Sequence, residues 1–198
     1  EPAAESEEPA PEEPEEEPEE PDEPDGAALA AAADAAQREV YDRSYYSRLA
    51  QADDEVKNYY YEVRNRILSY RKMTNRISWN YESFNRGRMQ CIKLKVRGKA
   101  LVMYIALDPN ELNVNKYHHQ DVSDKAKYAE VPTMMKIRSP RGMKYALELI
   151  DMLLAGKLNL GLKKVQPEPI TVEYESDEAL LEKGYIKVQY TSFGFGKD

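Results

Sequence analysis

The sequence predicts an α+β fold, an antiparallel meander of about four strands with N-terminal and C-terminal helices packed on one face. Three observations predict it. Apolar and Tyr residues recur at helical spacing between Arg43 and Lys72, alternation with period two follows from Ile77 to Leu107, and a second helical pattern begins after Ser139. Helices that flank a run of strands, instead of alternating with them, are typical of this class.

The first 25 residues differ in composition from the rest of the chain. They contain fourteen Asp or Glu, seven Pro and no Lys or Arg, and such a segment buries too little apolar surface to fold. We therefore expect a disordered acidic tether over residues 1–33, an α+β domain over 34–164 and a C-terminal extension over 165–198. The chain has a net charge of -8, so without the -14 of this segment the remainder carries +6.

The helical region is expected to divide into a short helix and a longer one. The acidic run Asp53–Glu55 is typical of a first helical turn, and Arg71 and Lys72 complement the helix dipole at the other end. The residues expected to face the core recur every three or four positions. They are Val56, Tyr59, Tyr60, Val63, Ile67 and Tyr70.

Three strands are expected next. Apolar and polar residues alternate in Ile77–Glu82 and again in Cys91–Val96, with a turn at Asn85–Arg88 between them. A tight turn at Arg97-Gly98 leads into an apolar third strand, Lys99–Leu107.

That turn also predicts the register of the second and third strands. If Arg97 and Gly98 form a two-residue turn, Lys93 lies opposite Val102 and Cys91 lies opposite Tyr104.

The rest of the domain closes the fold. Lys116–Ala129 is expected to be an irregular connection with a short strand, and Val131–Ser139 to be the fourth strand. Ser139-Pro140 is a typical helix start. The apolar stripe of that helix is Met143, Ala146, Leu147, Ile150, Leu153 and Leu154. The extension should contain a short helix at Asp177–Lys183 and a strand at Tyr185–Tyr190.

Basic residues are concentrated in the strands. Between Arg64 and Lys99 there are eleven Lys or Arg and one acid. If helices cover one face of the meander and leave the other wet, alternation places these charges on the wet face beside an Arg-Gly-Arg hairpin tip. The expected ligand-binding residues are Arg76, Ser78, Asn80, Glu82, Arg86, Arg88, Lys93, Lys95 and Tyr104.

Such a face favours a non-catalytic binding module for an anionic ligand or polymer, with nucleic acid or a glycan as the partner, because Arg and Lys neutralise phosphate and carboxylate groups. A second interpretation is a protein-interaction or scaffold module in which the charge is intramolecular and a peptide adds to a sheet edge. A third is frataxin-like iron handling.

Motifs typical of enzymes and cofactor sites are absent from the sequence, which has no phosphate loop, zinc-ligand spacing or Gly-x-Gly-x-x-Gly pattern. His118 and His119 are adjacent, so on a strand they would point to opposite faces, which argues against a shared metal. Cys91 has no neighbouring His to act as a base. We expect no catalytic residue, metal or cofactor.

The lone Cys91 excludes an intrachain disulfide, which favours a cytoplasmic location. No apolar run approaches the roughly 20 residues that cross a bilayer, so no membrane insertion by this segment is expected. Because the chain begins with Glu1 instead of Met, we expect it to be part of a larger membrane-anchored or multidomain protein.

Several motifs resemble a domain family of gut and clostridial bacteria. The stretches are LSYRKMTNRISWNYESFNRGR, RGKALVMYIALDP and KYHHQDVSDKAKYAEVPTMMKIRSPRGMKYALELI, and the family pattern contains R.SW..ES...GR and RGK.L..YLALDP. The resemblance covers residues 43–154. It implies domain boundaries and a preceding acidic linker instead of an activity.

At the level of the fold the chain is similar to small α+β proteins of the YdhG-like and YjbR-like types. The first resemblance implies iron handling of the frataxin type, and the second implies DNA binding. Iron delivery requires an exposed acidic ridge, whereas the domain offers only Asp53, Asp54 and Glu55 at a helix start. This departure favours the anionic partner.

Overall fold

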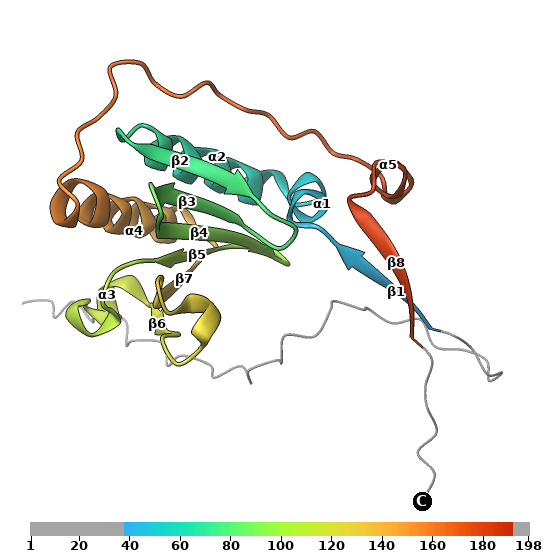
Figure 1. Cartoon of the computed structure of the whole chain (residues 1–198), viewed down its shortest axis with the longest axis horizontal. Coiled ribbons are helices and arrows are strands. Elements are labelled where there is room, and N and C mark those ends of the chain that lie inside the picture. The colour runs from blue at the N-terminus through green and yellow to red at the C-terminus, as the bar shows by residue number, and fades with distance from the viewer. Residues whose placement is uncertain (1–37, 192–198) are drawn as a thin grey trace, which may run out of the picture.

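The computed structural model describes residues 38–191 (Figure 1). The expected disordered tether, residues 1–33, lies outside the described residues.

An antiparallel sheet of six strands forms the centre of the domain, in the order β2-β3-β4-β5-β7-β6. The strands are β2 (Met73–Ile77), β3 (Glu82–Arg86), β4 (Met89–Arg97), β5 (Ala100–Ile105), β6 (Gln120–Asp121) and β7 (Thr133–Ile137). The α+β class is confirmed. The number of strands exceeds the expected four or so, because the short β6 is added and Ile77–Glu82 is not one strand.

Residues Ser78 to Tyr81 form a turn that separates β2 from β3. The backbone N–H of Ser78 donates to the carbonyl of Tyr81 at 2.9 Å, and the Ser78 hydroxyl donates to the same oxygen at 2.8 Å. Alternation alone did not indicate this turn, because Trp79 and Tyr81 fit a strand pattern.

Helices cover one face of the sheet, as predicted (Figure 1). They are α1 (Tyr45–Ala50), α2 (Asp54–Leu68) and α4 (Pro140–Asp151), which continues as the π-helix η3 (Met152–Lys157). All six residues of the expected α2 stripe are buried. The predicted α4 start is also confirmed, since Ser139 is the N-cap and its hydroxyl accepts a bond from the N–H of Gly142. The 3.6-residue period therefore identified the inward face of both long helices.

The opposite face of the sheet is covered by the chain between β5 and β7. This cover contains η1 (Pro109–Glu111), α3 (Val114–Tyr117), β6 and η2 (Ala126–Tyr128). The short strand expected in this connection is thus confirmed. Val122, Tyr128 and Val131 from the cover form a second apolar cluster with Val102, Tyr104 and Met134 of the sheet.

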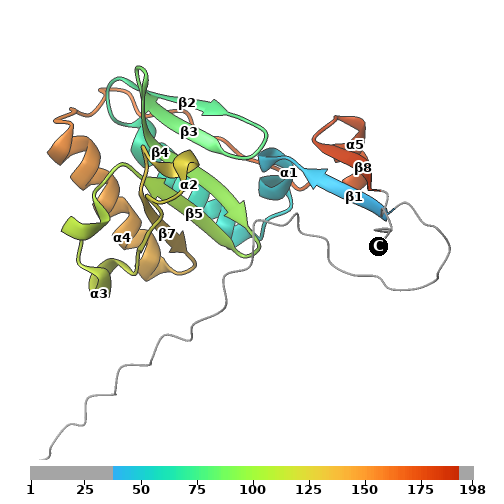
Figure 2. The ribbon, with the colours of Figure 1, turned by 60° about the horizontal axis from the view of Figure 1, so that its bottom comes forward.

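A two-stranded ribbon, β1 (Arg38–Arg43) and β8 (Ile186–Thr191), projects from one end of the domain (Figure 2). The expected helix of the extension is α5 (Asp177–Glu182). The expected strand is β8, and its partner β1 is not indicated by any local pattern. The ribbon joins the C-terminal extension to the start of the domain.

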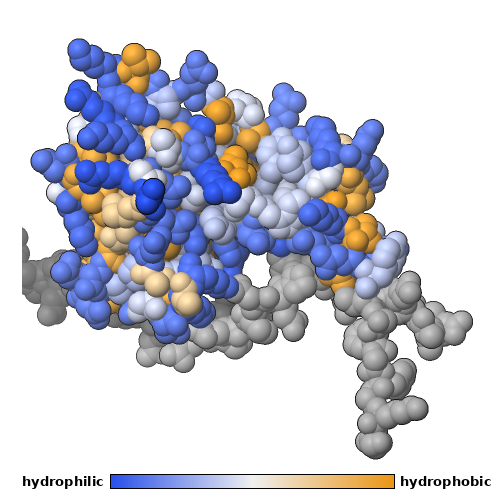
Figure 3. Space-filling model, in the orientation of Figure 1, coloured by the Kyte–Doolittle hydropathy of each residue, from blue (hydrophilic) through white to orange (hydrophobic). Residues whose placement is uncertain are grey.

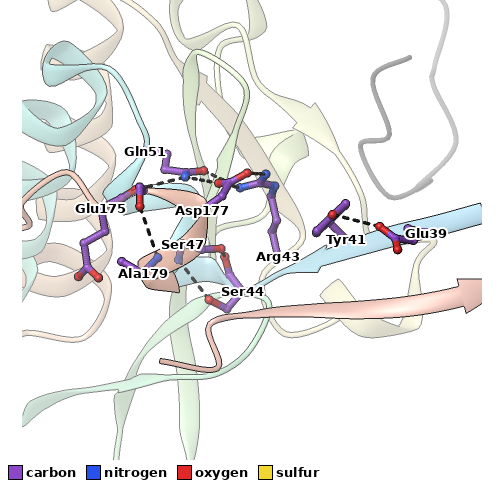
Figure 4. A network of polar contacts seen from close by, with 10 residues as sticks. Glu39, Tyr41, Arg43, Ser44, Ser47, Gln51, Glu175, Asp177 and Ala179 are labelled. Atoms are coloured by element: carbon purple, nitrogen blue, oxygen red, sulfur yellow. Dashed lines mark hydrogen bonds and ion pairs between the residues drawn. The ribbon is translucent and has the colours of Figure 1, made fainter. Parts of the chain in front are cut away.

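Polar contacts hold this extension against α1 (Figure 4). The Arg43 guanidinium makes two hydrogen bonds to the Asp177 carboxylate, at 2.9 and 2.7 Å. Gln51 accepts from Arg43 at 2.6 Å and donates to Asp177. Both hydrogen bonds lower the pKa of Asp177 to about 2, the one from Arg43 more than the one from Gln51. None of the described helices is both long and apolar enough to cross a membrane.

Candidate functional site

Cross-strand pairing places one row of side chains across all six strands. Directly opposed residues share a face of a sheet. The row is Arg76, Ser83, Lys93, Tyr104, Met134 and Gln120. A second, shorter row contains Lys95, Val102 and Lys136. We call the side of the sheet that carries both rows the basic face.

The predicted side is confirmed for Arg76, Lys93, Lys95 and Tyr104, which all lie on the basic face. The predicted register is wrong by two residues, since Lys93 pairs with Tyr104 instead of Val102. The turn consists of Gly98 and Lys99, with Gly98 at a φ of +50°, because Arg97 pairs with Ala100. A shift of two residues keeps every side chain on its face.

The expectation of a wet face is wrong for its central residues. The exposed fraction is 4% for Lys93 and 1% for Tyr104. Tyr128 of the cover stacks on Tyr104 with ring centroids 4.2 Å apart and an interplanar angle of 7°. Alternation reports the side to which a residue points, but not what lies above that side, so the sequence gave no warning of this cover.

Lys93 is the residue that ties the cover to the sheet. Its ammonium donates to the carbonyl of Lys127 at 3.0 Å and lies 4.5 and 5.1 Å from the ring centroids of Tyr81 and Tyr128. Burial lowers the pKa of Lys93, whereas the two rings favour its cationic form. Lys93 therefore supports the site from below and is not available to a ligand.

Lys95 and Tyr128 form a neighbouring pair. The Lys95 ammonium donates to the Tyr128 hydroxyl at 3.2 Å. Burial opposes ionisation of Tyr128, but hydrogen bonds with Tyr104 and Lys95 and the charges of Lys95 and Lys127 outweigh it and lower its pKa. The lowered pKa is a direct sign of positive potential around this phenol.

Glu82 does not belong to the basic face. It is fully buried on the helix side, where it accepts hydrogen bonds from the Tyr60 hydroxyl at 2.8 Å and the Asn75 amide at 2.7 Å. Arg64 Nε lies 3.7 Å from the same carboxylate. Burial, followed by the charge of Glu82, raises the pKa of Tyr60 well above its ordinary value. The prediction for Glu82 is wrong because the Ser78–Tyr81 turn changes the parity of the strand.

Ser78 and Asn80 lie in that turn, not on the sheet, so the structure does not bring them to the basic face. Arg86 and Arg88 lie at the β3–β4 hairpin, where Gly87 takes a φ of +62°. This hairpin is at the other end of β4 from Lys95. Six residues of strand at about 3.3 Å each separate Met89 from Lys95 by roughly 20 Å. The expected continuous positive surface is therefore divided.

A small pocket of about 150 Å³ opens beside Lys136, at the start of α4. Its lining residues are Tyr117, His118, Met135, Lys136, Arg138, Ser139, Arg141, Gly142 and Tyr145. Three of them are cationic and exposed, and no acidic residue is among the described lining residues. The nearby helix start adds partial positive charge from its free N–H groups.

We call Lys95, Lys136, Arg138 and Arg141 the basic strip. Row pairing joins Lys95 to Lys136 through Val102, and Lys136, Arg138 and Arg141 line the pocket together. Sequence reasoning missed the last three residues. The stretch KIRSPR contained a usable signal, since basic residues with period two run directly into a helix start.

Other reactive groups do not form a site. Cys91 is buried, and burial raises the pKa of its thiol. His119 is also buried and its Nε2 lies 2.9 Å from the carbonyl oxygen of Pro109. Within residues 38–191 no group of three or more His, Cys, Asp or Glu could hold a metal ion.

Comparison of the chain with protein-family models, curated proteins and solved structures finds no match. The resemblance to a domain family of gut and clostridial bacteria, and the more distant likeness to YdhG-like and YjbR-like proteins, therefore stay predictions.

Proposed function

We propose that the domain is a non-catalytic module that binds an anionic polymer on the basic strip. The observation that carries this proposal is the convergence of Lys136, Arg138 and Arg141 on one pocket, from β7 and α4, without an acid among the described lining residues. Lys95 extends the same positive surface across β5.

The structure changes which residues are proposed as contacts. Lys93 and Tyr104 are covered, and Glu82 lies on the other side of the sheet. Lys95, Lys136, Arg138 and Arg141 are partly or fully exposed, as is Arg76 at the β2 edge. Phosphate or sulfate groups spaced along a polymer suit such a strip, because each contact releases counterions and the contacts add along the chain.

The test is binding of labelled single-stranded RNA, duplex DNA and heparin to the full chain over a range of salt concentrations. Lys136→Ala/Arg138→Ala should weaken binding and flatten the slope of log K against log salt by roughly one for each lost contact. Arg86→Ala/Arg88→Ala is the matched control, since it removes the same charge from the far hairpin. Equal losses in the two variants would contradict a strip-centred site.

A second candidate function is peptide capture at the sheet edge. Strand β2 pairs only with β3, so its other edge is open, and Ile77 at its end is 54% exposed. Peptide addition depends on backbone hydrogen bonds and side-chain pockets, so it should be nearly independent of salt. In Figure 3 the visible hydrophobic residues form small separate patches on a largely hydrophilic surface, which favours the polymer proposal for this face.

A further inference from the structure

The two signs of charge are segregated in this chain. The segment Glu1–Asp25 carries fourteen acids and no base. In the described residues, acids gather around α5 and the segment before it. They are Glu173, Glu175, Asp177, Glu178 and Glu182. The basic strip is the surface of opposite sign, and the acid-rich region around α5 repels the acidic segment.

The acidic segment can reach the strip. Twelve residues, 26–37, separate Asp25 from the start of β1 at Arg38. At about 3.3 Å per residue these twelve span up to roughly 40 Å. A domain of this size has a radius of gyration near 15 Å, so this reach is comparable to its diameter.

Resting on the function proposed above, we propose that Glu1–Asp25 occupies the basic strip of its own chain and competes there with the anionic polymer. The segment resembles a polyanion in the property that the strip recognises, namely a dense row of negative groups. It acts as a tethered competitor whose strength depends on salt.

The size of the effect follows from the tether. A linked segment has an effective concentration on the order of millimolar. If the segment binds the strip as weakly as a non-specific polyanion, with a Kd on the order of 100 μM, the tether lowers the apparent affinity for polymer about tenfold. This competition should disappear at high salt.

The first experiment compares three full-length proteins in heparin and RNA binding at 50 and 500 mM salt. One is native, one has all fourteen acids of the segment replaced by Gln or Asn, and one has the 25 residues scrambled. The neutralised protein should bind about tenfold more tightly at low salt, and the scrambled protein should match the native one, because charge and not sequence carries the competition. Equal affinity of native and neutralised proteins overturns the tethered competitor and leaves the proposed function standing.

The second experiment needs no polymer, so it separates the two proposals. A nitroxide on Ser6→Cys is used with the native thiol in place, because Cys91 is fully buried. Amides of residues 136–141 should lose more NMR intensity than those of 86–88, and should recover at 500 mM salt. Equal broadening in both places overturns intramolecular docking. Broadening that appears only between differently labelled copies overturns it in favour of docking between chains. Failure of every protein to bind any polymer overturns the proposed function alone.

Discussion

The two faces of the sheet each bury one charged side chain, and they do so by different means. Under the helices, Glu82 is surrounded by the Tyr60 hydroxyl, the Asn75 amide and the Arg64 guanidinium. Under the cover, Lys93 has one carbonyl acceptor and two aromatic rings. Glu82 is fully buried, whereas Lys93 is 4% exposed.

The difference separates a charge that holds the core from a charge that holds a loop. The partners of Glu82 come from α2 and β2, so its loss leaves donors of two core elements without an acceptor. The partners of Lys93 come mainly from the cover, which contributes few apolar residues. We therefore expect the first charge to matter for global stability and the second for local order.

The largest expected effect is that of Glu82→Leu. Removal of one partner from a buried ion pair costs about 3–5 kcal/mol of unfolding free energy, because the remaining charge and donors stay buried. Urea denaturation measures it. Glu82→Gln, which keeps an acceptor for Asn75 and Tyr60, should lose less and should fold even if Glu82→Leu does not. Glu178→Gln, at an exposed site, is the control. A loss below about 1 kcal/mol for Glu82→Leu would mean that the carboxylate is dispensable.

Lys93→Met should have an intermediate effect that is confined to the cover. Met fills a similar volume and removes the desolvation of a buried charge, so global stability should change by no more than about 1 kcal/mol. Amide exchange in residues 126–131 should accelerate, because the bond to the Lys127 carbonyl is lost. Lys99→Met at the exposed turn should leave that exchange unchanged. A global loss as large as that of Glu82→Leu would remove the distinction between the two faces.

The smallest effect is expected for Asp177→Asn in the pair with Arg43. The Asp177 side chain is 45% exposed, and exposed ion pairs contribute about 0–1 kcal/mol because solvent screens them. Limited proteolysis in residues 163–176 should accelerate slightly, since the extension loses one attachment. The Asp177→Glu variant tests whether charge alone restores it.

The same pair gives a pH dependence with a definite sign. The pKa of Asp177 in the folded protein is about 2, below the ordinary Asp value near 3.9. The unfolded chain therefore binds more protons between these values, so the stabilisation is present above about pH 4 and is lost as pH falls towards 2. Asp177→Asn should lack this part of the acid response. An identical acid dependence of cleavage in both proteins would rule out the assignment.

Local pattern determined much of the helix-covered side. The α2 residues from Val56 to Tyr70 and the start of α4 at Ser139 were predicted and confirmed, because helical period and capping are local properties. The side on which Lys93, Lys95 and Tyr104 lie was also predicted, since alternation is set by the pleat.

The sequence by itself thus determined the α+β class, the inward faces of the helices, and the side of the sheet to which its basic residues point. Only the tertiary structure decided which of those residues meet solvent. Glu82 changed sides because a turn at Ser78–Tyr81 interrupts the strand. Lys93 became buried because residues distant in sequence close over it, and Lys95 and Lys136 became neighbours through long-range pairing. Burial and adjacency depend on contacts between segments, and no window of a few residues contains that information.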